Sequence, residues 1–221
     1  MTVRARPYRS PLRDEQARAT RRRIVDAGRE LFVERGYASA TIDAVAERAE
    51  VSRKTVFTSV GGKAAVLKLA FDWALAGDDE PVAIADRPEV RRMMQGQDPA
   101  VLLDEWIAMN AAIAGRVAPL HQVLVVAADT DSEAAALLTT LEQHRSDGAR
   151  AFVTRLQALE GLRPDLDVDR ATAITELLMD PLPYRRLVQL RGWTTAEYTD
   201  YLRHTAAAAL LPSENRTTVI P

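Results

Sequence analysis

Apolar residues recur at intervals of three and four along most of this 221-residue chain, the spacing that places them on one face of an α-helix. Alternating apolar and polar positions, typical of a half-buried β-strand, do not recur. The pattern therefore predicts an all-α protein of about nine helices. We expect them over about 14–35, 41–49, 52–60, 63–76, 98–115, 116–128, 132–160, 168–180 and 194–211, with a short further segment at 184–190.

Glycines, prolines and a charge run divide this helical pattern. Gly36 ends the first helix. Residues 77–96 contain two prolines and an acidic run, and we interpret them as a linker with one helical turn near 89–94. We expect a flexible basic arm over residues 1–20, a three-helix domain over 21–63, a larger helical bundle over 64–212 and a tail over 213–221.

The expected arm is rich in arginine and precedes any convincing apolar stripe. Pro7 and Pro11 disfavour a helix in it. Two functions fit such a segment: insertion into a DNA minor groove, or simple solubilisation of the terminus. Its arginines are Arg4, Arg6, Arg9, Arg13 and Arg18.

Residues 41–57 hold two short helical patterns that meet across a three-residue joint. Thr41 and Ser52 are good N-cap residues at the two helix starts, and residues 50–51 lie in the joint. Val45 and Val56 point the inner faces of both helices at one core. This arrangement predicts a helix-turn-helix, a unit that binds DNA through its second helix.

The second of these helices begins with two cations, Arg53 and Lys54. Cations in a first turn oppose the helix dipole at about 0.3–1 kcal/mol each, so they are poorly placed for stability and well placed to meet an external anion. A DNA backbone or a guanine edge would supply that partner. The alternative is a solvated helix face with incidental charges.

Charge is divided unevenly along the chain. Residues 1–63 hold 14 Arg and Lys against 8 Asp and Glu, whereas the remainder holds 15 against 23, so the net charge of −2 conceals a basic end on an acidic body. This asymmetry is expected when one end docks on a polyanion.

Several function classes lack a basis in the sequence. Cysteine is absent, and His121, His144 and His204 are scattered without metal-ligand spacing, so we expect no metal or other cofactor. Neither HExxH nor GxSxG occurs, and we expect no enzyme. We find no apolar run near the ~20 residues that cross a bilayer and no apolar segment after the first arginines, so we expect a cytoplasmic protein with no membrane partner.

Two features of the larger bundle need a local explanation. Arg145 and Gly148 fall on the apolar stripe of the helix expected over 132–160, where they form either a pocket wall or a close helix contact with an internal salt bridge. Thr194 and Glu197 form a capping box, with Trp193 and Tyr198 at the two positions of a hydrophobic staple.

From Arg23 to about Leu69 the chain resembles the DNA-binding domain of the TetR family of bacterial transcriptional regulators. The matching residues fix three helices and their joints together, which makes the resemblance specific. They are Ile24, Ala27, Leu31, Phe32, Gly36, Tyr37, Thr41, Ile42, Val45, Ala46, Ala49, Val51, Ser52, Thr55, Val56 and Lys63.

The resemblance implies a homodimer that binds a palindromic operator in double-stranded DNA, dimerises through its last two long helices and acts as a repressor released by a small-molecule effector. It implies base contacts from Arg53, Lys54 and Thr55, flanked by Thr58 and Ser59, and phosphate contacts from Lys63 and Thr41. Ser52 and Phe57 complete the expected DNA-binding set. Candidate effector-binding residues are Trp106, Met109, Arg116, His121 and Arg145.

Three positions depart from the family pattern. Glu50 stands where glycine is usual, so the turn either pays an αL penalty of order 1 kcal/mol or takes another shape. Phe57 replaces tyrosine, and its ring either packs on the fold or meets a thymine methyl. Ser59 replaces an aromatic residue or histidine. Two other functions stay open: a helical ligand-binding protein or enzyme with an incidental basic end, and a nonspecific architectural DNA binder.

Overall fold

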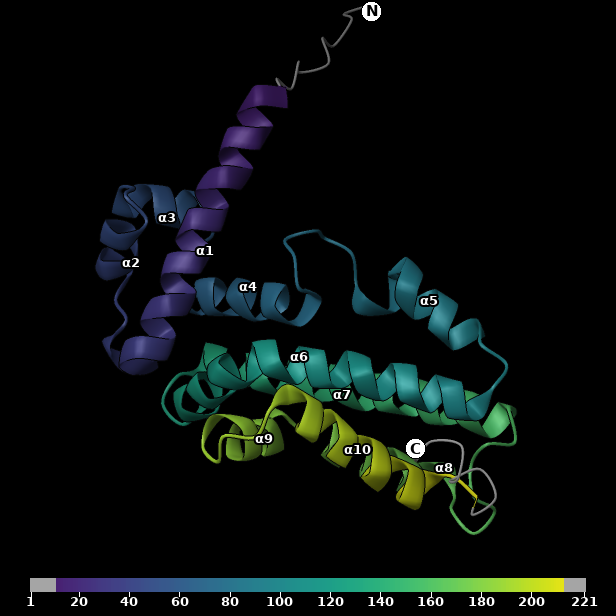
Figure 1. The fold of residues 1–221 in the computed structure, drawn as a ribbon. Helices are drawn as coiled ribbons and strands as arrows, with labels where there is room; N and C mark the ends of the chain where they lie inside the picture. Colours follow the sequence, from purple (N-terminus) through teal and green to yellow (C-terminus); the bar gives the residue numbers. More distant parts are fainter. Residues whose placement is uncertain (1–10, 213–221) are drawn as a thin grey trace, which may run out of the picture. The chain divides into compact units, whose positions relative to one another are not determined.

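Helices account for every regular element in the part of the chain that this computed structural model describes, residues 11–212 (Figure 1). The all-α prediction is confirmed. The α-helices are α1 (Pro11–Ser39), α2 (Ile42–Arg48), α3 (Arg53–Ser59), α4 (Lys63–Ala76), α5 (Pro88–Gln95), α6 (Pro99–Ala128), α7 (Ser132–Ala158), α8 (Val168–Leu178), α9 (Pro181–Tyr184) and α10 (Thr195–Leu210). A 3₁₀ turn, η1 (Ile84–Asp86), precedes α5, and a π-helical turn, η2 (Arg185–Gln189), follows α9.

The chain divides into two compact units, with the boundary between Ala70 and Phe71. This boundary lies inside α4, later than the division after Lys63 that the sequence suggested. In the N-terminal unit, α1 to α3 bury Ile24, Phe32, Val45 and Val56. These are stripe positions of the sequence pattern, because one apolar face from each helix must share a single core.

The first helix begins earlier than expected. α1 starts at Pro11, so Arg13 and Arg18 lie on a helix and the prediction of an arm extending to residue 20 is wrong. Proline is tolerated in a first turn, where its missing N–H would have no partner within the helix. The expected arginines Arg4, Arg6 and Arg9 lie outside the described residues, as does the predicted tail from residue 213.

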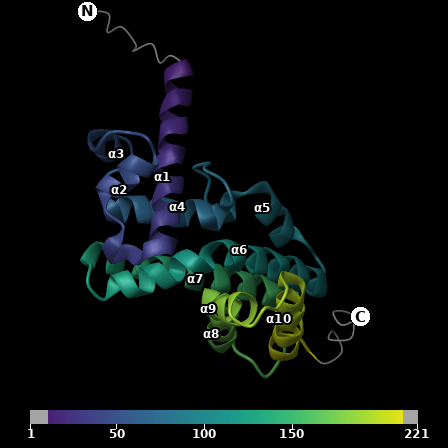
Figure 2. The same ribbon diagram turned by 60° about the vertical axis from the view of Figure 1, so that its left-hand side comes forward.

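The C-terminal unit is built around α6, which packs against α7, α9 and α10 (Figures 1 and 2). The sequence predicted two helices here, separated near Pro119, but α6 continues through that proline for 30 residues. An internal proline costs about 3 kcal/mol, and burial on both sides outweighs this cost. Val117 and Ala118 before it and Leu120 and Leu124 after it are all buried.

The same helix corrects the expectation that no apolar run approaches membrane-spanning length. α6 is long and apolar enough to cross a bilayer by length and composition alone. Its apolar residues instead form the core of the C-terminal unit, where Trp106 stacks on Phe152 of α7 with ring centroids 4.3 Å apart. A helix that is apolar on most of its surface is expected at the centre of a helical bundle.

Arg145 on α7 has the structural explanation that the sequence left open. Its Nη1 lies 3.7 Å from Oδ2 of Asp180, just before α9, and its side chain is 23% exposed. A charge this far from water needs a partner, and the carboxylate supplies it. This geometry supports the salt-bridge alternative. Gly148 is less constrained, because a Cβ added there would meet only the end of Met179, at 3.9 Å.

The start of α10 confirms the capping box and contradicts the staple. Thr194 Oγ1 accepts from the Glu197 amide at 3.2 Å, and Glu197 Oε2 accepts from the Thr194 amide at 2.7 Å. Trp193, however, packs edge-on against Tyr201 and not against Tyr198. Tyr198 is fully buried against Tyr184, because α9 and η2 bring the Tyr184 ring over the start of α10.

The segment between α4 and α6 is more ordered than the predicted linker. Arg87 donates to both oxygens of Asp78, at 2.6 and 2.8 Å, and this pair lowers the pKa of Asp78 to about 2. Arg116 of α6 donates to the carbonyls of Ala74 at 2.7 Å and Leu75 at 3.0 Å. These bonds satisfy carbonyls that the end of α4 leaves without partners within the helix.

Candidate nucleic-acid interface

The helix-turn-helix predicted over residues 41–57 is present, with both helix starts capped. Thr41 Oγ1 accepts from the Ala44 amide at 3.1 Å, and Ser52 Oγ accepts from the Thr55 amide at 3.0 Å. The turn is closed by a bond from the Val51 amide to the Ala46 carbonyl at 2.9 Å. Because the terminal backbone groups have partners, the turn holds α3 in a defined direction relative to α2.

Glu50 adopts the conformation that a glycine would favour at this turn. Its φ is +53°, in the left-handed region, so the first of the two expected alternatives, an αL penalty, is the one that occurs. A residue with a Cβ costs about 1–2 kcal/mol there. The turn therefore keeps its shape at the expense of local stability.

Replacing Glu50 with glycine should raise the stability of the N-terminal unit by about 0.5–1 kcal/mol. The relief of left-handed strain exceeds the extra unfolded-state entropy of glycine, about 0.4–1 kcal/mol. Urea titration followed by circular dichroism would measure the change. Glu47→Gly is the matched control: this residue lies inside α2 with helical geometry, so the same substitution should destabilise by about 1 kcal/mol. A Glu50→Gly protein less stable than the parent would contradict the strain assignment.

Two residue pairs that join α1 to α2 and α3 hold the helix-turn-helix in place. Arg48 of α2 donates to both carboxylate oxygens of Glu34, at 2.9 and 2.8 Å, and this hydrogen bonding is the main reason that the pKa of Glu34 is lowered. Arg21 donates from Nε to the carbonyl of Ser59, the last residue of α3, at 3.2 Å. Sequence reasoning missed both, because each joins residues from separate helices and leaves no local pattern.

The exposed face of α3 carries four of the predicted DNA-binding residues. Arg53 and Phe57 form one row, and Lys54 and Thr58 form the next, each four residues apart. The Phe57 side chain is 46% exposed, so it is not packed into the fold. Lys54 is exposed as well, and within residues 11–212 its ammonium group has no ionic partner. This face combines positive charge with an accessible ring.

Arg53 differs from the expectation that its partner is external. Its Nη1 donates to both oxygens of Asp43 in α2, at 2.9 and 2.7 Å. Its guanidinium carbon also lies 5.6 Å from the centroid of the Phe57 ring. Asp43 was not among the predicted site residues, although an acidic residue in the first turn of α2 is a signal that the sequence carries.

The predicted hydroxyl residues of α3 are partly engaged within the helix. Thr55 Oγ1 lies 2.8 Å from Ser52 Oγ, and Thr58 Oγ1 donates to the Lys54 carbonyl at 3.0 Å. Ser59 is only half-buried. A hydroxyl that donates its hydrogen still has acceptor capacity, so Thr58 is suited to accept from a base amino group.

Lys63 lies at the start of α4 and contacts the end of α1. Its Nζ donates to the carbonyl of Ala38 at 3.2 Å and stands 4.2 Å from the Tyr37 ring centroid. An ammonium group carries three hydrogen-bond donors, the chemistry that a phosphate contact uses.

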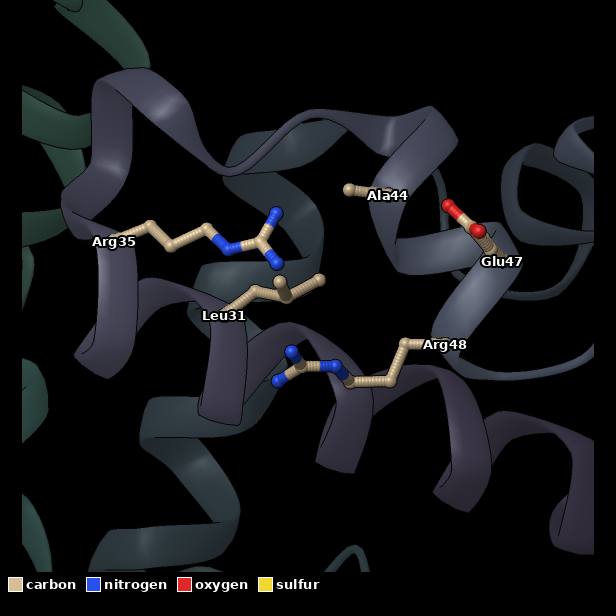
Figure 3. Close-up of a pocket in the computed structure, with 5 residues that line it drawn as sticks. All are labelled: Leu31, Arg35, Ala44, Glu47 and Arg48. Carbon is tan, nitrogen blue, oxygen red and sulfur yellow. The ribbon is translucent and has the colours of Figure 1, made fainter.

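A shallow pocket of about 280 Å³ lies between α1 and α2 (Figure 3). Leu31 forms part of its wall, and the charged groups of Arg35, Glu47 and Arg48 surround it. None of the predicted DNA-binding or effector-binding residues lines this pocket.

The five candidate effector residues separate into different environments. Trp106 is buried in the α6–α7 stack, Met109 packs against the same core, and Arg116 is bonded to the end of α4. Arg145 pairs with Asp180, and burial lowers the pKa of His121, with smaller influences from the charges of Asp180 and Arg145.

Comparison with known proteins agrees with the geometry. Residues 24–70 match the family model for bacterial regulatory proteins of the tetR family. The chain is 36% identical over 75 residues to two proteins of Pseudomonas putida, the uncharacterized HTH-type transcriptional regulator TtgW and the HTH-type transcriptional regulator SrpR. Each match covers 34% of this chain, but 53% of TtgW and 33% of SrpR.

Among solved structures, this fold is similar to that of NalD, the secondary repressor of the MexAB-OprM multidrug efflux pump in Pseudomonas aeruginosa. The TM-score is 0.66 at 16% identity, covering 89% of this chain and 99% of NalD. The likeness extends through both units, so the C-terminal bundle shares this fold as well. Within the N-terminal unit, residues 24–70 are therefore similar to the family that the sequence resembled.

Proposed function

From the TetR-type DNA-binding domain of residues 24–70, we propose that this protein is a homodimeric transcriptional regulator that binds a palindromic operator, represses transcription and is released by a small-molecule effector. The observation that carries the proposal is the exposed face of α3, where Arg53 and Lys54 project from a helix-turn-helix whose caps and turn are satisfied. A helix presented in this way fits the major groove. The protein would act in the cytoplasm, where it reaches chromosomal DNA.

The predicted contacts fall into two classes with different consequences. Arg53, Lys54 and Thr55 would contact base edges and therefore specify sequence. Lys63 and Thr41 would contact phosphates and position the domain. Ser52, Phe57, Thr58 and Ser59 would complete the interface around them.

The homodimer is supported by exposed apolar side chains on the last two long helices. Leu177 of α8 is 72% exposed and Tyr201 of α10 is 43% exposed. Ala173, one turn before Leu177, is exposed as well and would let a second helix approach closely. A two-fold interface buries the same patch on both partners, so each apolar residue counts twice.

Effector release is supported by the connection between α6 and the end of α4. Through Arg116, α6 holds the carbonyls of Ala74 and Leu75, and α6 also carries Trp106, Met109 and His121. A ligand that displaced α6 would therefore pull on α4, the helix that begins at Lys63. We include Arg145 in the effector-binding set because it pairs with Asp180 and its charge lowers the pKa of His121.

Binding of the full-length protein to duplexes from the DNA flanking its own gene, followed by fluorescence anisotropy, would test this function. A scrambled duplex of the same composition serves as the reference, at several salt concentrations. We expect affinity that falls with salt and a preference of at least about 10³ for one flanking segment. A preference near one would instead identify a nonspecific architectural DNA binder. Absent or salt-insensitive binding would favour the other alternative, a helical enzyme or ligand-binding protein.

Lys63→Ala should weaken binding to the operator and to scrambled DNA by the same factor. With one phosphate contact in each protomer, the plot of log affinity against log salt concentration should become shallower by about 2. Because Lys63 also contacts Ala38, thermal unfolding must confirm that the variant is folded. Arg150→Ala removes a cation from α7 and should leave the slope unchanged. A loss confined to the operator would contradict the phosphate assignment.

A further inference from the structure

Asp43 places an exposed negative charge beside the two cations of α3. Its side chain is 66% exposed, and that of Arg53 is 60% exposed. An ion pair at this exposure contributes little to the free energy of folding, so stability alone does not explain what Asp43 does beside Arg53. A carboxylate near the proposed DNA-facing surface also repels phosphates, and this repulsion weakens binding to DNA of any sequence. A second role for Asp43 at this surface would explain why the carboxylate stands there.

The Arg53 guanidinium is held by two contacts of different kinds. Asp43 binds Nη1 with both carboxylate oxygens, at 2.9 and 2.7 Å. The Phe57 ring, one turn further along α3, lies 5.6 Å from the guanidinium carbon, within the range of a cation–π contact. A hydrogen bond fixes one nitrogen and a ring face restrains the rest of the group. Together they restrict an otherwise flexible side chain.

This restraint leaves the other edge of the guanidinium available. Within residues 11–212, Nε and Nη2 of Arg53 have no hydrogen-bond partner. These two nitrogens carry three N–H donors on a rigid fork. Two parallel donors of this kind match O6 and N7 of guanine, the commonest specific arginine contact in the major groove.

We propose that Asp43 is a specificity-determining residue: with Phe57, it orients Arg53 so that the Nε–Nη2 edge contacts one guanine in each half-site, and its charge weakens binding to any other DNA. This inference rests on the proposed function of α3. Asp43 acts through Arg53 and is therefore a positioning residue. A preorganised side chain loses less freedom on binding, and this benefit is realised only at the guanine that fits it.

The test compares Asp43→Asn, Arg53→Ala and the double variant on the operator, on operators substituted symmetrically at each base pair, and on scrambled DNA. The base pair at which Arg53→Ala loses discrimination identifies the Arg53 contact. Asp43→Asn should lose about 10-fold of discrimination at that same base pair, and the double variant should lose no more there than Arg53→Ala does. The affinity of the Asp43→Asn protein for scrambled DNA should rise severalfold, with a steeper salt dependence.

Two further variants separate positioning from charge and from folding. Asp26→Asn removes the same charge from an exposed site on α1 and should preserve discrimination at every base pair. Phe57→Leu removes the ring face from the Arg53 guanidinium and should reduce discrimination at the Arg53 base pair. Circular dichroism would confirm that each variant is folded.

Full discrimination by Asp43→Asn at the Arg53 base pair would overturn the proposal. So would a loss at a different base pair, because the carboxylate would then contact a base directly. Failure of the proposed function looks different: the unmodified protein would then show no sequence preference at all.

Discussion

Replacing Arg53 with alanine is expected to cause the largest loss of specific DNA binding of any single substitution on α3. A bidentate contact between arginine and guanine contributes about 1–3 kcal/mol of discrimination, and a homodimer makes it in both half-sites. The operator affinity should therefore fall by about 2–6 kcal/mol, which corresponds to roughly 30-fold to 10⁴-fold. Fluorescence anisotropy on the operator and on a scrambled duplex would measure both affinities.

The two duplexes separate loss of readout from loss of charge. Arg53→Ala should lower operator affinity more than scrambled-DNA affinity, because the guanine contact is made only on the operator while the loss of charge affects both duplexes. Lys54→Ala is the neighbouring comparison, since Lys54 has no ionic partner within the described residues. It removes the same charge from the same helix, so its effect on scrambled-DNA affinity measures the electrostatic share of the Arg53→Ala loss. An Arg53→Ala protein with undiminished operator preference would overturn the assignment of α3 as the reading surface.

Replacing Leu177 with glutamate is expected to convert the homodimer to a monomer. Burying a leucine contributes about 1.5–3 kcal/mol, and two copies meet across a two-fold interface. Losing both, and burying two carboxylates instead, should raise the dimer dissociation constant by at least about 10³-fold. Sedimentation equilibrium would detect the change, and operator affinity should fall with it because a monomer occupies only one half-site.

A matched substitution controls for added surface charge. Val101, near the start of α6, is 54% exposed and lies outside α8 and α10, so Val101→Glu should leave the dimer intact. A Leu177→Glu protein that sediments as a dimer would place the interface elsewhere. Tyr201→Glu, on α10, would then be the next variant to compare, because its ring is also exposed.

Predictions from neighbouring residues were confirmed where the start of a helix depends only on those residues. The caps at Thr41 and Ser52 and the capping box at Thr194 all form as predicted, because each joins residues only a few positions apart. The same kind of prediction was wrong at Pro119, where the burial of α6 outweighs the cost of a proline within a helix. Only the packing of α6 against its neighbours supplies that energy.

Long-range pairing was beyond the reach of a local pattern. The bonds of Arg48 with Glu34, Arg21 with Ser59 and Arg116 with Ala74 join residues 14, 38 and 42 positions apart. Nothing in the spacing of such residues marks them as partners. These contacts nevertheless hold α2, α3 and the end of α4 in place.

The sequence alone was sufficient for the helical class, the helix-turn-helix at residues 41–57 and the charges of Arg53 and Lys54, because periodicity, capping and charge are properties of neighbouring residues. The tertiary structure decided how those charges can be used. It placed Asp43 and Phe57 around Arg53, left Lys54 without an ionic partner within the described residues and gave Glu50 a left-handed conformation. The physical reason is that a side chain's partner and orientation depend on which helices fold against each other, and that information lies in the whole chain.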